Sequence, residues 1–142
     1  MNTSVTMPYK LKLRRCINNN IIIIIHNRGN NNNHADLVLK TFLENVDDIG
    51  DNQLTIHDIT VTNSNSVSVE SLYNALVIAK DVNPDVINLS LGVNLDDKNI
   101  RSTIEELTKN GVIIIASAGN RFGMSAQYPA RYNAVISVGS LD

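Results

Sequence analysis

The chain has 142 residues and a formal net charge of −2. By length it is one domain, long enough to enclose a hydrophobic core. Its 43% hydrophobic and 18% charged content is typical of a globular protein, not of a disordered one. The near-neutral charge gives no support to nucleic acid or an anionic membrane surface as a partner. The single cysteine, Cys16, excludes an internal disulfide framework and a multi-cysteine metal site.

The N-terminal residues are basic but show no targeting signal. The lysines and arginines before Cys16 are not followed by an apolar stretch of signal-peptide type, and the isoleucines at 21–25 are too few to span a membrane. We therefore expect a cytoplasmic, reducing setting by default. We expect residues 1–19 to form an N-terminal arm or edge strand, and residues 20–142 to form one partial domain.

Strand and helix patterns alternate along the rest of the chain. The five isoleucines at 21–25 predict a central strand buried on both faces. The periodicity that follows predicts, in chain order, a helix at 34–46, a strand at 54–61, a helix at 70–80, a strand at 86–91, a helix at 97–109, and strands at 112–116 and 134–138. This alternation predicts an α/β fold with three layers, α/β/α, around a mostly parallel sheet.

Two details of these strands bear on function. In the strand at 54–61, His57 and Asp58 are adjacent, so we expect them to point to opposite faces and not to act as partners. The strand at 112–116 is a run of branched side chains that we expect to be buried on both faces. Small residues and Asn120 follow it, and Asn120 would place an amide at the carboxyl edge of the sheet, where open α/β sheets bind ligands.

Three blocks of sequence resemble the subtilisin-like serine proteases. These blocks are DVINLSLG at 85–92, GVIIIASAGN at 111–120 and YPARYNAVISVGSLD at 128–142. Their order and spacing match the motifs of that family. The resemblance covers roughly residues 20–142 and stops about two-thirds of the way through a typical catalytic domain. It implies a subtilisin-like sheet that lacks its C-terminal third.

The resemblance implies a groove for an extended peptide. In the family, an S-x-G segment hydrogen-bonds to the substrate backbone, and small residues after the next strand line the pocket for the side chain before the cleaved bond. The family asparagine, here Asn120, donates to the developing oxyanion. The residues of this sequence that match the substrate-binding segments are Ser90, Leu91, Gly92, Ser117, Ala118 and Gly119.

The catalytic triad is incomplete in this sequence. The family aspartate ends the first buried strand, where this chain has His26. An imidazole there brings no fixed negative charge to support a neighbouring histidine. The family histidine opens a helix with H-G-T-x-V, and His34 of H-A-D-L-V is the only candidate for that base; the alternative is a polar residue that caps the helix. The serine segment G-T-S-x-A does not occur in these 142 residues, and we interpret Ser125 and Ser140 as loop residues.

Three functions remain open at this point. The first is a catalytically incomplete subtilisin-like domain that binds an extended peptide by strand addition. The second is a serine endopeptidase half that a separate serine-bearing chain completes. The third is a plain α/β domain that binds a small ligand or a protein. Apolar surface left by the missing third would also favour self-association or a partner chain.

No cofactor is expected. Neither G-x-G-x-x-G nor G-x-x-x-x-G-K follows the first strand, which argues against binding of nucleotide phosphates. The three histidines, His26, His34 and His57, are not at metal-ligand spacing.

Overall fold

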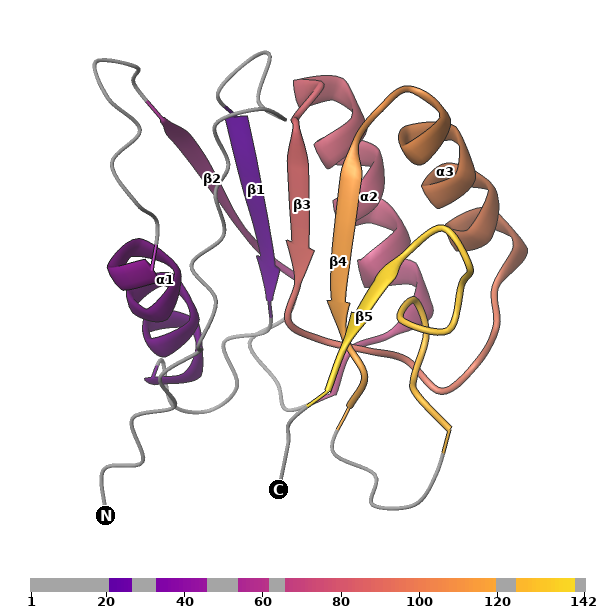
Figure 1. The fold of residues 1–142 in the computed structure, drawn as a ribbon. Helices are drawn as coiled ribbons and strands as arrows, with labels where there is room; N and C mark the ends of the chain where they lie inside the picture. The colour runs from indigo at the N-terminus through magenta and orange to yellow at the C-terminus, as the bar shows by residue number, and fades with distance from the viewer. Residues whose placement is uncertain (1–20, 27–32, 46–53, 62–65, 120–124, 140–142) are drawn as a thin grey trace.

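A computed structural model describes residues 21–26, 33–45, 54–61, 66–119 and 125–139. The arm predicted for residues 1–19 lies outside these ranges. The described residues form one parallel sheet with strand order β2-β1-β3-β4-β5 (Figure 1). The strands are β1 (Ile21–His26), β2 (Thr55–Thr60), β3 (Val86–Leu89), β4 (Ile113–Ser117) and β5 (Ile136–Val138). Three helices connect them: α1 (Asn33–Asn45), α2 (Val69–Val82) and α3 (Lys98–Lys109).

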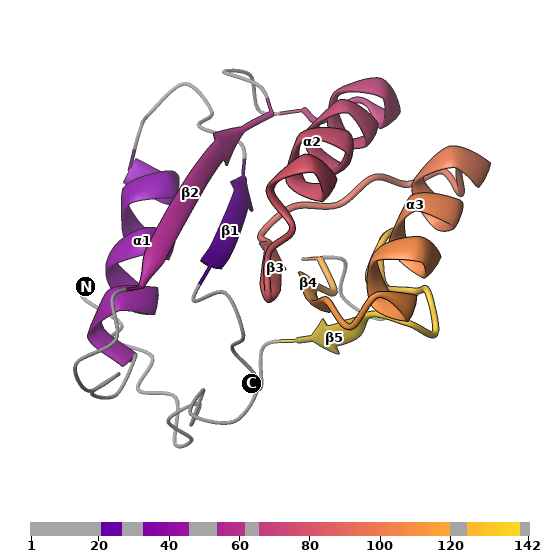
Figure 2. The same ribbon diagram turned by 90° about the horizontal axis from the view of Figure 1, so that it is seen from above.

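The helices form two layers around the sheet. Helices α2 and α3 cover one face, and α1 lies on the opposite face beside β1 and β2 (Figures 1 and 2). This arrangement confirms the predicted three-layer α/β/α fold. None of the helices in the described ranges is both long and apolar enough to cross a bilayer.

Strand β1 is the centre of the core, as its sequence predicted. Its side chains alternate between two hydrophobic clusters. Ile23 and Ile25 join the large cluster under α2 and α3, while Ile22 and Ile24 join the smaller cluster under α1. All four are at most 1% exposed. Burial on both faces is why an unbroken run of β-branched residues suits this position.

Local sequence signals fix where helices α2 and α3 begin or end. Asp97 caps α3 by accepting hydrogen bonds from the backbone N–H groups of Asn99 and Ile100, both at 2.9 Å. Beyond the last turn of α3, Gly111 adopts a φ of +91°, a conformation that favours glycine. Helix α2 extends slightly beyond the predicted range and ends at Asn83, whose φ is +54°.

The prediction that β4 is buried on both faces is wrong for one face. Ile114 and Ala116 are fully buried on the side of α2 and α3. On the other side, Ile113 and Ile115 are only partly buried. The physical reason is that α1 packs over β1, so no described helix covers this end of the same face.

The third and fifth strands are shorter than predicted. Strand β3 leaves the sheet after Leu89, and its continuation turns to pair with a later loop through an antiparallel bridge between Val93 and Tyr128. Strand β5 begins at Ile136, because a turn closed by a hydrogen bond from the Val135 N–H to the Tyr132 carbonyl (3.0 Å) comes before it.

Candidate functional site

The two predicted binding segments leave the sheet side by side. Strands β3 and β4 are neighbours, and Leu89 lies opposite Ala116 in their register. Residues 90–92 follow β3, while Ser117 ends β4 and residues 118–119 follow it. Because both strands are parallel, both segments emerge at the same carboxyl edge of the sheet. The segments 90–92 and 117–119 are therefore neighbours in the structure.

The backbone of residues 90–93 is anchored at both ends. The Ser90 N–H donates to the Ile25 carbonyl (3.1 Å), and Val93 exchanges two hydrogen bonds with Tyr128 (2.8 and 2.9 Å). Between these anchors, the backbone groups of Leu91 and Gly92 make no hydrogen bond to any residue in the described ranges. The Leu91 side chain lies in the core, so only its backbone can contact a ligand.

Gln127 lies between the two binding segments. A Cβ atom placed on Gly92 would lie 2.8 Å from the Gln127 Cβ, and one placed on Gly119 would lie 2.6 Å from the Gln127 Oε1. The Gln127 side chain donates to the Asn94 Oδ1 (2.8 Å), and its backbone N–H donates to the Ala118 carbonyl (3.0 Å). Gln127 thus occupies the space that two adjacent glycines leave open.

At the end of β1, His26 is buried and bonded to a carboxylate. Its side chain is 1% exposed, and its Nε2 contacts the Oδ1 of Asp58, whose side chain is 37% exposed. The buried Nδ1 has no hydrogen-bond partner in the part of the chain that the structure describes. His26 lies opposite Thr60 in the register of β1 and β2, so Asp58, two residues before Thr60, points to the same face.

This pairing changes one interpretation of the sequence. His26 itself supplies no negative charge, but Asp58 supplies one beside it from the neighbouring strand. His57 and Asp58 are consecutive residues of β2 and so point to opposite faces, as expected, and Asp58 contacts His26.

The remaining predicted residues are placed only in part. His34 lies in the first turn of α1, and its side chain is outside the described residues. Asn120 is also outside them. Ser117 lies opposite Val138, and the N–H of Ala118 donates to the carbonyl of Val138 at 2.8 Å.

An aromatic cluster supports the loop that carries Gln127. The rings of Tyr128 and Tyr132 are 5.0 Å apart, and Arg131 lies over the ring of Tyr128 at 5.0 Å. The Tyr132 hydroxyl donates to the Asp96 Oδ1 (2.9 Å) near the start of α3. Burial is the main cause that raises the pKa of Tyr132 above 10.0. The cluster therefore ties this loop to α3.

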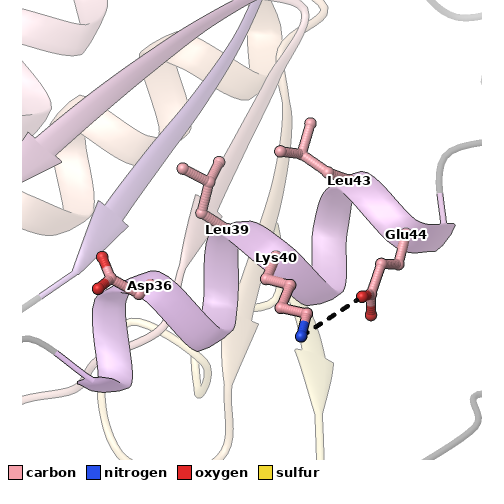
Figure 3. Close-up of a pocket in the computed structure, with 5 residues that line it drawn as sticks. All are labelled: Asp36, Leu39, Lys40, Leu43 and Glu44. Atoms are coloured by element: carbon pink, nitrogen blue, oxygen red, sulfur yellow. Dashed lines mark ion pairs between the residues drawn. The ribbon is translucent and has the colours of Figure 1, made fainter.

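A separate hollow of about 380 Å³ lies on α1, and the described residues that line it all come from that helix (Figure 3). Lys40 and Glu44 form an ion pair at 3.8 Å on its rim, one helical turn apart. Leu39 and Leu43 give it an apolar wall. None of the predicted site residues lines it, so it adds nothing to the candidate peptide site.

Two residues of this region were missed by the sequence analysis, Asp58 and Gln127. A carboxylate on the same face of β2 as Ile56, at Asp58, was a usable signal, because Ile56 packs against the core and a polar side chain beside it needs a partner. The position of Gln127 had no such signal, since it depends on how the loop after β4 folds back.

The domain is thus a parallel α/β sheet with helices on both faces, and the segments 90–92 and 117–119 lie side by side at its carboxyl edge. The chain belongs to the subtilase family, whose family model matches residues 19–142. It is similar to Subtilisin DY of Bacillus licheniformis, with 30% identity over 94 residues, which cover 63% of this chain and 34% of that protein. It is also similar to Subtilisin Savinase of Lederbergia lenta, with 35% identity over 79 residues, which cover 56% of this chain and 29% of that protein.

A solved structure has the same fold. The structure of the prenylagaramide maturation protease PagA matches with a TM-score of 0.69 at 19% sequence identity. The match covers 96% of this chain and 60% of that one. The chain thus spans about a third or less of the two curated relatives above.

Proposed function

We propose that this subtilase-family domain binds an extended polypeptide beside residues 90–92, and that these 142 residues alone do not cleave it. The observation that carries the proposal is that the backbone groups of Leu91 and Gly92 make no hydrogen bond to a described residue, while the segment 117–119 lies next to them. An extended peptide that adds alongside a strand needs only such free N–H and C=O groups. The anchors at Ser90 and Val93 hold the segment in place before the peptide arrives.

The proposed lack of cleavage rests on the sequence. Acyl transfer in this family needs a serine nucleophile, a histidine base and a carboxylate that orients the histidine. This sequence has His26 at the position of the carboxylate and contains no G-T-S-x-A segment. Asn120 would remain as an oxyanion donor, but that contribution requires a nucleophile to attack the carbonyl.

Gln127 sets which peptides fit. Its side chain is within contact distance of both Gly92 and Gly119, so a bulky ligand side chain would have to displace it from its bond to Asn94. We therefore expect the domain to prefer peptides with a small side chain at the position that faces these glycines.

Calorimetric titration tests the proposal with a capped peptide of six alanines flanked by lysines. The control peptide has the same sequence with alternate backbone nitrogens methylated, which removes the donors that strand addition uses. We expect the first peptide to bind and the methylated one to bind at least about tenfold more weakly, a difference of about 1.4 kcal/mol. Equal binding of the two, or no binding of either, contradicts the proposal.

The Gln127→Ala variant tests the specificity. It removes the amide between the glycines, so a peptide with phenylalanine in place of a central alanine should gain affinity relative to the all-alanine peptide. The matched control is Asn94→Ala, which removes the acceptor of the Gln127 amide but keeps its bulk. If both variants behave as the wild type does toward the phenylalanine peptide, Gln127 does not control access.

A second candidate is a protease half that a separate serine-bearing chain completes. The Asp58 carboxylate beside His26 favours it, because it brings a negative charge to the strand end where the family has its aspartate. Labelling with a fluorophosphonate probe separates the two candidates. Labelled partner that appears only when this chain is added would favour the protease half, and no labelling under any condition would favour the binding domain.

A further inference from the structure

The connection between α3 and β4 contains the one Asn-Gly pair of the sequence, Asn110-Gly111. We call residues 108–112 the α3–β4 turn. Asn110 caps the C-terminal end of α3, and both residues of the pair are exposed. No atom of the described residues lies within 4 Å of a Cβ placed on Gly111. Because glycine has no side chain, nothing on Gly111 itself shields its backbone nitrogen from the side-chain amide of Asn110.

This pair has the groups for an intramolecular reaction that needs only water. The Gly111 nitrogen, once it has lost its proton, attacks the side-chain carbonyl carbon (Cγ) of Asn110. A bond forms between these two atoms, the bond from Cγ to the side-chain nitrogen breaks, and that nitrogen takes up a proton and leaves as ammonia. Water then opens the resulting five-membered succinimide. Opening at Cγ gives aspartate, whereas opening at the main-chain carbonyl carbon gives isoaspartate, whose main chain contains one extra carbon atom.

The folded turn holds the reacting nitrogen in a hydrogen bond. The Gly111 N–H donates to the Thr108 carbonyl (3.0 Å), and a bonded N–H is protected from losing its proton until the turn opens. The Asn110 N–H is held as well, by the Glu106 and Leu107 carbonyls at 3.1 Å each. The reaction therefore requires local opening at the end of α3, which is also what hydrogen exchange of the Gly111 amide requires.

We propose that Asn110 is a site of spontaneous deamidation and that opening of the α3–β4 turn sets its rate. Either product weakens the turn in which it forms. Both products add a negative charge at the C-terminal end of α3, where the helix dipole disfavours one. Isoaspartate also lengthens the chain just before Val112, which is buried and whose N–H donates to the Leu107 carbonyl (3.1 Å). This inference is independent of the proposed peptide site.

Peptide mapping by mass spectrometry tests the proposal. The 142-residue chain is kept in mildly alkaline buffer, either folded or unfolded in urea, and loss of each asparagine amide is followed over time. The internal control is Asn83, which is exposed and caps the C-terminal end of α2, but is followed by Pro84, whose nitrogen carries no proton. We expect Asn110 to react in urea while Asn83 stays unmodified. Folding should slow the reaction of Asn110 at least about tenfold, an opening free energy of about 1.4 kcal/mol or more.

Hydrogen exchange of the Gly111 amide provides an independent measure of the same opening. The factor by which folding slows deamidation should agree within about threefold with the factor by which it slows this exchange, since both reactions begin with loss of the same proton.

Two variants test the effect on stability. Asn110→Asp supplies the aspartate product and should lower the midpoint of thermal unfolding by about 1–5 °C. Asn110→Gln is the matched control, because it keeps an uncharged amide but would have to close a six-membered ring. It should stay unmodified over the same period and unfold closer to the wild type than Asn110→Asp does. Circular dichroism follows the unfolding of both.

Three results overturn the proposal. The first is an Asn110 that reacts in urea no faster than Asn83. The second is an equal rate in the folded and unfolded chains, or a slowing that does not match the exchange of the Gly111 amide, because the turn would then not control the reaction. The third is an Asn110→Asp variant as stable as the wild type, which would show that the added charge does not weaken the turn.

Discussion

His26 on β1 and Asp58 on β2 are bonded side chain to side chain, the imidazole almost fully buried and the carboxylate about one-third exposed. The two residues come from neighbouring parallel strands and share one face of the sheet. Burying a polar ring is costly unless its nitrogens are bonded. Asp58 is thus the described residue that makes a histidine tolerable at this position.

Two substitutions of Asp58 distinguish the stability that comes from its hydrogen bond from the stability that comes from its charge. Asp58→Ala removes the partner of the His26 Nε2 and should lower the free energy of unfolding by about 1–3 kcal/mol, toward the lower end because Asp58 is partly exposed. Asp58→Asn keeps an acceptor oxygen and should cost less. Urea unfolding followed by circular dichroism measures both. In a His26→Leu background the Asp58→Ala cost should be smaller than in the wild type; a cost unchanged in that background would show that the two side chains are not coupled.

Tyr132 should make the protein less stable at alkaline pH. Burial raises its pKa above 10.0, so the phenol stays neutral in the folded state to higher pH than in the unfolded state. Above about pH 10 the unfolded state binds fewer protons, and the free energy of unfolding therefore falls as pH rises. Tyr132→Phe should show a smaller fall between pH 8 and about pH 10.5. Equal pH dependence of the two proteins in urea unfolding would refute this role.

Gly111 and Gly119 form a matched pair, since both have a φ of +91°. No atom lies within 4 Å of a Cβ placed on Gly111, so Gly111→Ala should cost only the backbone strain, about 1–2 kcal/mol. Gly119→Ala should cost more, because its Cβ would lie 2.6 Å from the Gln127 Oε1. Thermal unfolding measures both. In a Gln127→Ala background the two costs should become equal, and a persistent difference would point to a contact other than Gln127.

Asp97 should contribute to stability through its side chain as the cap of α3. It accepts two backbone hydrogen bonds, and Asp97→Ala should lower the free energy of unfolding by about 1 kcal/mol. Asp97→Asn keeps a capping oxygen and should be nearly neutral. Ser68→Ala, at the single-bond cap of α2, provides the comparison. If Asp97→Ala and Asp97→Asn cost the same in chemical unfolding, the charge matters more than the cap.

The sequence predicted those features that depend on short stretches of chain. Five isoleucines made β1 recognisable, and Asp97 at the start and Gly111 just past the end made α3 recognisable, because periodicity and end signals are local. The fold class followed from the order of these elements, and the two binding segments at 90–92 and 117–119 followed from the resemblance to the family motifs.

Features that depend on contacts between distant segments were not predictable in the same way. The bond between His26 and Asp58 requires the register of β1 against β2, which neither strand encodes alone. The place of Gln127 requires a loop to fold back between two strand ends. The partial exposure of Ile113 and Ile115 depends on where α1 packs. A run of β-branched residues predicts a strand but does not show whether a helix covers it.

The antiparallel bridge between Val93 and Tyr128 has a consequence for how the molecule moves. Its two hydrogen bonds join the two ends of the segment that contains α3 and β4. The amide protons of α3 and β4 should therefore exchange with solvent as one cooperative unit, with a shared opening free energy. A ligand bound at Gly92, next to this bridge, would slow the hydrogen exchange of α3 without contacting that helix.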